Sequence, residues 1–315
     1  MTDSYPVSVS VVKPIRPALK RMKEILFQPF SIRKWLSIGF CSFLALRSAS
    51  YSYKSFSHGN QKTSFGWADI QQYIHQHPTQ VIWGALAVLV VFLLIFFVIV
   101  WLNCRGQFMF LHCVALNRGE VAIPWKRFKQ AAGNLWKFNS VIGLLILINI
   151  LIAAAIVVYV KIRNPYFGSG DFLRLLPLFG TFLLVVLVFC IITFFTKEFL
   201  VPIMFLRGGT WSDGWRELGD LIRVNPWRFT LYILFQIVIG LGILLVLIAA
   251  VLCTCCLGGL LLLIPYIGSV LLLPVTVFQR SYSLYYLAQY GDRFDVFSDI
   301  TSEKYSSKDP EENLQ

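Results

Sequence analysis

The sequence predicts an all-α, polytopic membrane protein: six transmembrane helices built as three parallel repeats, each a cytoplasmic amphipathic helix followed by a two-span hairpin. Three observations predict this fold. The chain has 315 residues, of which 57% are apolar and 14% are charged, whereas soluble proteins carry about 25% charged residues. Long windows lack Asp, Glu, Lys, Arg and His altogether: 81–104, 139–160, 175–196 and 229–279. A basic amphipathic segment precedes each predicted pair of spans.

The windows give the predicted spans. Because a helix needs about 20 apolar residues to cross a bilayer, spans are expected at 35–50, 80–103, 139–160 and 171–196, with two more in 229–279. The first of these is short and carries Arg47 near its end. The last window is expected to turn at Gly258 and Gly259, and Pro265 and Pro274 should kink or break its second span.

The basic residues predict the orientation. Seven Lys and Arg precede Trp35, six lie in 104–138 and five in 197–228, against three in 47–80, three in 161–174 and none at the turn. Cytoplasmic loops carry the excess of Lys and Arg. Both termini are therefore predicted to be cytoplasmic, which requires the short first span to cross.

Three amphipathic lead segments, 15–35, 125–138 and 215–229, divide the chain. The first has apolar residues at helical spacing and bases on the other face, so it is expected to lie in the headgroup plane. Packing of this helix on other protein is the alternative. The predicted organisation is a disordered lead (1–14), one membrane domain (15–290, with repeats of about 15–120, 121–209 and 210–290) and a disordered acidic tail (291–315).

The candidate functional residues are bases at the cytoplasmic face. They lie on the first two leads or at the end of each even-numbered span, where a base can hold lipid phosphates or the last helix carbonyls. These candidate lipid-headgroup residues are Lys20, Arg21, Lys23, Lys126, Arg127, Lys129, Arg105, Lys197 and Arg280. No catalytic, cofactor-binding or metal-binding motif is found.

A few other polar residues need an interpretation. Asn149 and Gln236 are the strongly polar residues deep in the spans, and they are read as interhelical hydrogen-bond partners. His75 and His77 point to opposite sides of a helix and are read as surface histidines. Three cysteines near the turn are assigned a packing role, with an intermolecular disulfide left open: Cys253, Cys255 and Cys256.

Two stretches carry a resemblance to known membrane proteins: RPALKRMKEILFQPFSIRKWLSIGFCSFLA and CCLGGLLLLIPYIGSVLLLPVTVFQRSYSLYYLAQYG. They resemble an uncharacterised bacterial six-span integral membrane family. More distantly, the plan is similar to the membrane domain of glycerophosphodiester phosphodiesterases. The resemblance implies a multi-pass protein of the bacterial cytoplasmic (inner) membrane. It does not carry the phosphodiesterase activity, because the chain lacks the attached catalytic domain and its carboxylate cluster.

We therefore expect a non-enzymatic integral membrane protein that organises lipid or partner proteins through a basic cytoplasmic collar. The alternative is a permease or transporter of a small solute or lipid, with a cavity between the repeats. The net charge of +12 does not indicate nucleic acid, because the bases collect between the spans. Membrane lipid is the expected partner, no cofactor is expected, and protein partners and a homo-oligomer are left open.

Overall fold

The computed structural model describes residues 9–46, 76, 78–119, 121–163, 169–254, 259, 261–262 and 264–297. Within these residues every regular element is a helix. The α-helices are α1 (Ile15–Leu26), α2 (Ile32–Leu46), α4 (Pro78–Leu116), α5 (Ala122–Arg127), α6 (Lys129–Arg163), α7 (Ser169–Phe195), α8 (Val201–Arg207), α9 (Trp211–Val224), α10 (Pro226–Cys253), α12 (Pro265–Leu271) and α13 (Leu273–Ala288). A π-helix, η1 (Thr196–Leu200), joins α7 to α8, and a 3-10 helix, η2 (Asp292–Phe294), follows α13.

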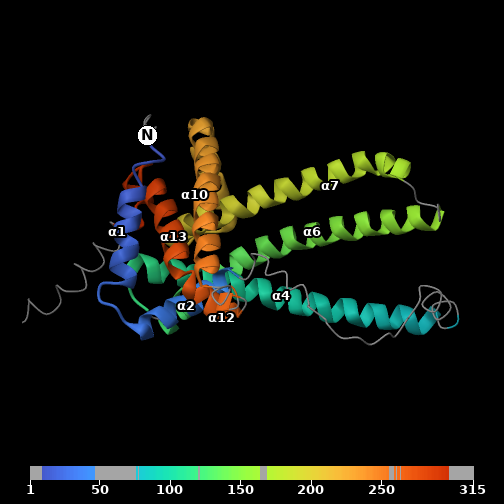
Figure 1. Cartoon of the computed structure of the whole chain (residues 1–315), viewed down its shortest axis with the longest axis horizontal. Coiled ribbons are helices and arrows are strands. Elements are labelled where there is room, and N and C mark those ends of the chain that lie inside the picture. The colour runs from blue at the N-terminus through green and yellow to red at the C-terminus, as the bar shows by residue number, and fades with distance from the viewer. Residues whose placement is uncertain are drawn as a thin grey trace, which may run out of the picture.

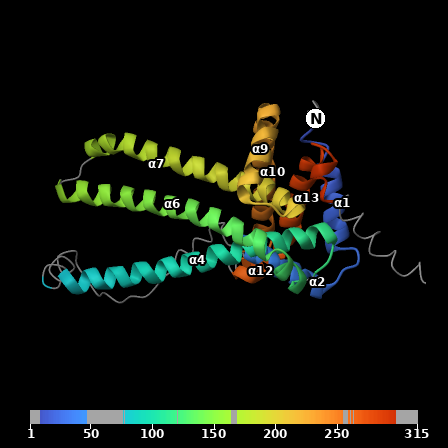
Figure 2. The ribbon, with the colours of Figure 1, turned by 180° about the vertical axis from the view of Figure 1, so that it is seen from behind.

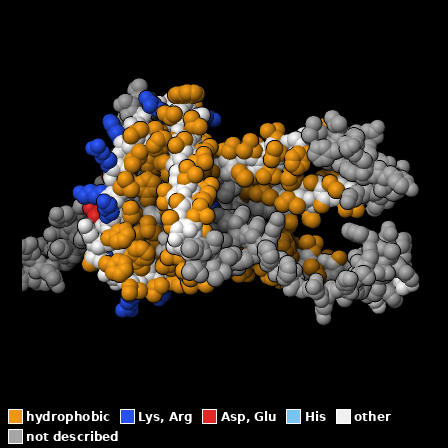
Figure 3. Space-filling model, in the orientation of Figure 1, with side chains coloured by type: hydrophobic (Ala, Val, Ile, Leu, Met, Phe, Trp, Pro, Cys, Tyr) orange, Lys and Arg blue, Asp and Glu red, His pale blue; other side chains and the backbone are white. Residues whose placement is uncertain are grey.

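Four helical segments of the described chain are long and apolar enough to cross a membrane: Thr79–Leu116, Lys129–Val160, Phe179–Arg207 and Pro226–Cys253. They coincide with the second to fifth predicted spans, and four helices of this length and apolarity indicate a membrane protein. Figures 1 and 2 show α4, α6 and α7 running side by side, while α10 runs in a different direction. Apolar side chains cover the visible surface of these helices (Figure 3). Such a surface requires lipid or protein to cover it.

The remaining helices form a compact unit, which we call the head: α1, α2, α5, α8, α9, α12 and α13, with the last turns of α4 and the first turns of α6 and α10. Residues 104–115 of α4 are all buried, so this part of α4 is a central helix of the core. The largest fully buried side chains include Phe108, Phe199, Tyr232 and Tyr286. The core therefore lies at one end of the long helices and not between them.

The first predicted span is not among the four candidates. Its helix, α2, packs against the last turns of α4: Lys34 Nζ donates to Asn117 Oδ1 at 2.7 Å, and Asn103 Nδ2 donates to the carbonyls of Leu44 and Ala45 at 3.1 and 2.7 Å. Helix α2 therefore lies antiparallel to the buried end of α4. The 15 described residues of α2 extend about 22 Å at 1.5 Å per residue, and residues 47–50 of the predicted span lie outside the described part of the chain.

The sixth predicted span is broken into two helices, as the prolines predicted. Helix α12 begins at Pro265, and a residue outside the helix, Leu272, separates it from α13, which has Pro274 in its first turn. Helix α12 packs on α2, where Tyr266 Oη donates to the Leu36 carbonyl at 3.1 Å. Helix α13 is buried along most of its length. Both pieces are thus parts of the head.

Helix α1 packs on protein. Its apolar residues Ala18, Ile25 and Leu26 are fully buried, and its neighbour is α13. This is the alternative that the sequence left open, and it means that the apolar face of α1 does not lie in the headgroup plane.

The ordered domain is also longer at both ends than predicted. Ser10 and Gln289 exchange two hydrogen bonds of 2.9 Å, and Val296 is fully buried. The predicted disordered lead (1–14) and tail (291–315) therefore include ordered residues, 9–14 and 291–297. Residues 1–8 and 298–315 lie outside the described part of the chain.

The contact between α2 and α4 can be tested at Gly106. A Cβ at this position would lie 2.5 Å from Leu44 Cβ and 2.6 Å from the Ala45 backbone nitrogen. Because the obstacle includes backbone, Gly106→Ala should push α2 away and destabilise the protein by about 1–3 kcal/mol, the usual cost of overpacking. Thermal unfolding in detergent measures the effect.

Gly219 is the matched control, because nothing lies within 4 Å of the Cβ position in the middle of α9. Gly219→Ala should be neutral or stabilise the protein by up to about 1 kcal/mol. Equal unfolding midpoints for the two variants would contradict the packing of α2 on α4.

Candidate functional site

The predicted headgroup residues separate into a buried and an exposed group. Three arginines are drawn into the head, where each guanidinium donates to helix carbonyls. Arg21 donates to the Val114 and Ala115 carbonyls at the end of α4. Arg105 donates to the Trp125 carbonyl at 2.9 Å, and Arg280 donates to the Lys197 carbonyl. Arg105 and Arg280 are each 8% exposed. The sequence left open whether such bases hold lipid phosphates or helix carbonyls, and in the structure these arginines bind carbonyls.

Arg105 also stands between two tryptophan rings. Its guanidinium carbon lies 4.8 Å from the Trp101 ring centroid and 4.6 Å from that of Trp125. The two rings contact each other edge to face, with centroids 5.7 Å apart. Tryptophan is enriched at membrane–water boundaries, and apolar residues 81–100 of α4 precede this cluster. The cluster therefore places α5 where the apolar part of α4 ends.

The exposed bases are Lys20, Lys23, Lys126, Arg127 and Lys129. They lie at two different levels along α4. Those of α5 and the start of α6 lie near Arg105, whereas α1 meets α4 at Val114 and Ala115. At 1.5 Å per residue, the ten residues from Arg105 to Ala115 separate the two levels by about 15 Å. In the view of Figure 3, Lys and Arg side chains gather on the head, at the end away from the long helices.

A cluster of ionic and polar side chains lies where η1, α10 and α13 meet. Arg280, Tyr232 and Ser283 are buried in it, and Lys197 and Glu198 are partly buried. Its centre is Glu198, whose Oε2 accepts a hydrogen bond from Tyr232 Oη at 3.4 Å. The Arg280 guanidinium and the Ser283 hydroxyl also lie beside this carboxylate, and Lys197 is its neighbour in the chain. Both Lys197 and Glu198 belong to the π-helix, a geometry often found at functional sites.

The sequence interpretation did not identify Glu198. The charge-free window ends at Thr196, and Lys197 was assigned to the cytoplasmic loop. The candidate span Phe179–Arg207 includes both charged residues. The available signal was the adjacent Lys-Glu pair directly after an apolar window.

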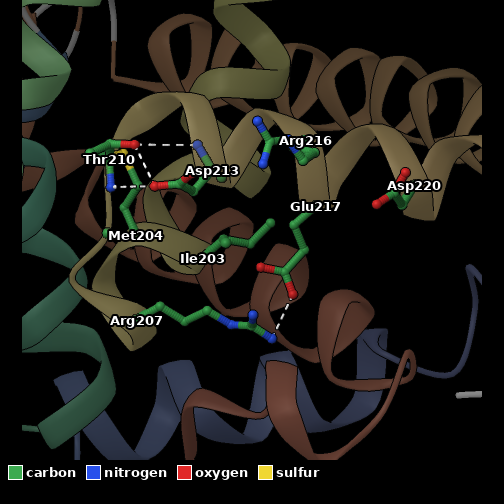
Figure 4. Close-up of a pocket in the computed structure, with 10 residues that line it drawn as sticks. Ile203, Met204, Arg207, Thr210, Asp213, Arg216, Glu217 and Asp220 are labelled. Atoms are coloured by element: carbon green, nitrogen blue, oxygen red, sulfur yellow. Dashed lines mark hydrogen bonds and ion pairs between the residues drawn. The ribbon is translucent and has the colours of Figure 1, made fainter. Parts of the chain in front are cut away.

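A polar pocket of about 300 Å³ lies at the bend between α8 and α9 (Figure 4). Glu217 Oε1 pairs with Arg207 Nη2 at 2.6 Å. On the other side, Thr210 and Asp213 form a capping box that begins α9, with Thr210 Oγ1 donating to Asp213 Oδ2 at 2.5 Å. The carboxylates of Glu217 and Asp213 therefore each have a partner within the pocket.

Two carboxyl groups of the pocket have shifted pKa values in opposite directions. Hydrogen bonds from the Thr210 hydroxyl and backbone lower the pKa of Asp213. Burial raises the pKa of Glu217, and the nearby cation of Arg207 opposes this rise. No group of three or more His, Cys, Asp or Glu that could hold a metal ion occurs in the described residues. The pocket thus offers charge pairing and a protonatable carboxylate.

The intramembrane polar residues are not brought together. Asn149 lies on α6 and Gln236 on α10, and these two helices run in different directions (Figure 1). The amide oxygens of both side chains are buried and have no hydrogen-bond partner among the described residues. Their predicted interhelical bonds remain a prediction. His75, His77, Cys255 and Cys256 lie outside the described residues, and Cys253 is an exposed free thiol.

Comparison with known protein families gives a match. Residues 9–273 match the model of a family described as "Family of unknown function (DUF7544)". No curated protein and no solved structure matches the chain.

The pocket ion pair predicts a pH-dependent loss of stability in Arg207→Gln. Without the cation, the pKa of Glu217 should rise further above its unfolded-state value. A carboxyl group with a raised folded-state pKa opposes folding when the pH exceeds that pKa, and the penalty vanishes when both states are protonated. The variant should therefore be less stable than the parent by about 1 kcal/mol near pH 7, and the difference should disappear as the pH falls through the folded-state pKa of Glu217.

Thermal unfolding midpoints across this pH range are the measurement. The double variant Arg207→Gln/Glu217→Gln is the control, because it has no carboxylate at position 217 to protonate. The difference between its unfolding midpoint and that of the parent should not disappear at acidic pH. A difference between Arg207→Gln and the parent that is equal at acidic and neutral pH would contradict the pairing.

Proposed function

Since the chain belongs to the family of unknown function DUF7544, we propose its function from the geometry: it is a non-enzymatic integral membrane protein whose head binds anionic lipid at the cytoplasmic face of its own membrane. The four long apolar helices anchor it. We assign the head and both termini to the cytoplasm of a bacterial cell, with the inner membrane as its location. The distribution of Lys and Arg supports this orientation.

The observation that carries the proposal is the position of the bases on α5. Lys126 and Arg127 are exposed one and two residues after Trp125, which is held against Trp101 and Arg105 where the apolar part of α4 ends. Exposed Ile123 precedes them by one turn. An apolar residue beside bases at this level is the arrangement expected of a segment that meets phosphate headgroups.

Electrostatics favours the α5 bases over those of α1. A base near an anionic membrane contributes about 1 kcal/mol, and the field falls off within a Debye length, which is about 8 Å at physiological ionic strength. The bases of α5 and Lys129 lie at the boundary, whereas α1 lies about 15 Å farther along α4. Lipid binding should therefore depend on Lys126, Arg127 and Lys129.

The packing of the head supports the three-unit plan that we include in the proposal. Each lead helix packs on the end of the preceding unit: α5 on α4, α9 on η1 and α8, and α1 on α13. The last pairing closes the series, and α4, α8–η1 and α13 also contact one another. This cyclic pattern is what three parallel repeats around a common axis would produce. In that plan α2 and α12–α13 occupy the first and sixth span positions.

The test measures the lipid that remains bound to the purified full chain after extraction from mixed micelles of phosphatidylglycerol and phosphatidylcholine. Lys126→Gln, Arg127→Gln and Lys129→Gln together remove up to about 3 kcal/mol of attraction. Retained phosphatidylglycerol, quantified by mass spectrometry, should fall at least about tenfold.

The matched control is Lys20→Gln/Lys23→Gln, which removes exposed bases from α1. It should retain phosphatidylglycerol like the parent. If the control loses as much lipid as the α5 variant, or if the α5 variant loses none, the proposal is wrong.

One observation favours the alternative, a permease for a small solute or lipid. Glu198 and Lys197 lie within a candidate span, and ionisable residues at such positions mark transport pathways in many membrane proteins. In a permease this cluster would be reached by water from both sides of the membrane.

Accessibility of the cluster separates the two functions. In a chain whose native cysteines are replaced by alanine, Ser283→Cys places a thiol beside Glu198 at a fully buried position. In sealed vesicles we expect no reaction with a membrane-impermeant maleimide from the side opposite the head. Labelling from both sides would replace the lipid-binding proposal with the permease.

A further inference from the structure

We propose that the acidic segment 298–315 binds in cis to a basic stripe on the outer face of α1, formed by Arg16, Lys20 and Lys23. This contact is separate from lipid binding by α5 and does not depend on it. The occupant is a segment of the same chain. Two observations identify it: Phe297 lies against α1, and residues 298–315 carry a net negative charge.

The stripe is a continuous face of α1. Arg16, Lys20 and Lys23 are spaced by four and three residues, so they lie one above another on one side of the helix. All three are exposed, and the Lys20 side chain is 81% exposed. The opposite side carries Ala18 and Ile25, which are buried against the rest of the head. The helix therefore presents its bases outward because its apolar face is already occupied.

The position of the stripe argues against the membrane surface as its occupant. Helix α1 is held at the far end of α4 by the Arg21 contacts with Val114 and Ala115. That level is about 15 Å from Arg105, or nearly two Debye lengths at physiological salt. Within α1, Lys20 already lies 3.9 Å from Glu24 one turn further on, and Lys20 remains exposed in this pair. Any further acidic partner of this stripe must come from the aqueous side.

The chain delivers an acidic segment to this place. The last described residue, Phe297, lies under the Arg21 guanidinium of α1 at 5.2 Å and stacks on Tyr285 with centroids 4.5 Å apart. Residues 298–315 carry five acids and two bases, a net charge of −3 (five minus two). The acids are Asp299, Glu303, Asp309, Glu311 and Glu312.

The segment is long enough to cover the stripe. An extended chain spans about 3.3–3.6 Å per residue, so Asp299 can reach about 7 Å from Phe297, and Glu303 about 20 Å. From Arg16 to Lys23 the stripe covers seven helical steps of 1.5 Å, about 10 Å. Single exposed ion pairs are weak, but a short tether gives an effective concentration in the millimolar range. The tethered segment therefore outcompetes separate acidic partners for the stripe when their concentration is well below this value.

The first test uses the full chain in zwitterionic detergent, without anionic lipid. A carbodiimide joins amines to carboxylates that are in direct contact, and peptide mass spectrometry identifies the pairs. We expect Lys20 and Lys23 to be joined to acids of 298–315, with a yield that falls at least about fivefold at 1 M salt, where the Debye length is about 3 Å. A mixture of isotope-labelled and unlabelled chains separates pairs within one chain from pairs between two copies.

A second measurement reads the stripe itself. Changing the five acids to Asn and Gln should raise the acetylation rate of Lys20 and Lys23 at least about twofold, because the covering carboxylates are lost, and should leave that of Lys126 and Lys129 unchanged. Unchanged rates at Lys20 and Lys23 would overturn the proposal, as would products that join the segment mainly to Lys126 and Lys129. Products found only between labelled and unlabelled chains would overturn the contact in cis and assign the stripe to a second copy. Neither experiment contains anionic lipid, so failure here leaves the proposed lipid binding untouched.

Discussion

Buried or half-buried guanidinium groups that donate to backbone carbonyls join the helices of the head. Arg21 ties α1 to the end of α4, Arg105 ties α4 to α5, and Arg280 ties α13 to η1. Arginine stays charged at any physiological pH, so each buried guanidinium must keep its acceptors, and the helix ends that supply them are fixed in place. Helix α2 is also held through its backbone carbonyls, but by a neutral donor: the Asn103 amide donates to the carbonyls of Leu44 and Ala45.

The long helices could be predicted because a charge-free window of 20 or more residues has few alternatives to a membrane helix. The level along α4 at which α2 packs could not be predicted. It depends on hydrogen bonds between residues far apart in the sequence, from Lys34 to Asn117 and from Asn103 to Ala45. For the candidate bases, the sequence predicted a contact either with lipid headgroups or with helix carbonyls. Arg105 and Arg280 are buried and donate to carbonyls, so they have the second role. Glu198 was missed because it lies in a π-helix, which the sequence pattern did not predict, and because its neighbours Tyr232 and Arg280 are far away in the sequence.

The structure separates basic residues that the sequence grouped into one collar. Some hold the fold together, those of α5 lie where the apolar part of α4 ends, and those of α1 lie farther out. The proposed lipid binding at one level and the proposed acidic contact at the other could then be changed independently. Helix α10 contributes to neither surface. Its buried residues, Phe229 and Tyr232, lie in its first two turns, so its direction is set by the joint at Asn225 and Pro226.

The pairing of α1 with α13 has a consequence for how the protein is made. Helix α1 leaves the ribosome well before α13, yet its apolar residues Ala18, Ile25 and Leu26 are buried against the head to which α13 belongs. About 260 residues separate them, so at 5–20 residues per second the delay is roughly 15–50 s. During that time α1 is an uncovered basic amphipathic helix next to a membrane, and the bilayer surface is its natural temporary partner. In the folded protein α1 does not lie in the headgroup plane, but it would bind there during synthesis, until α13 is available to cover it.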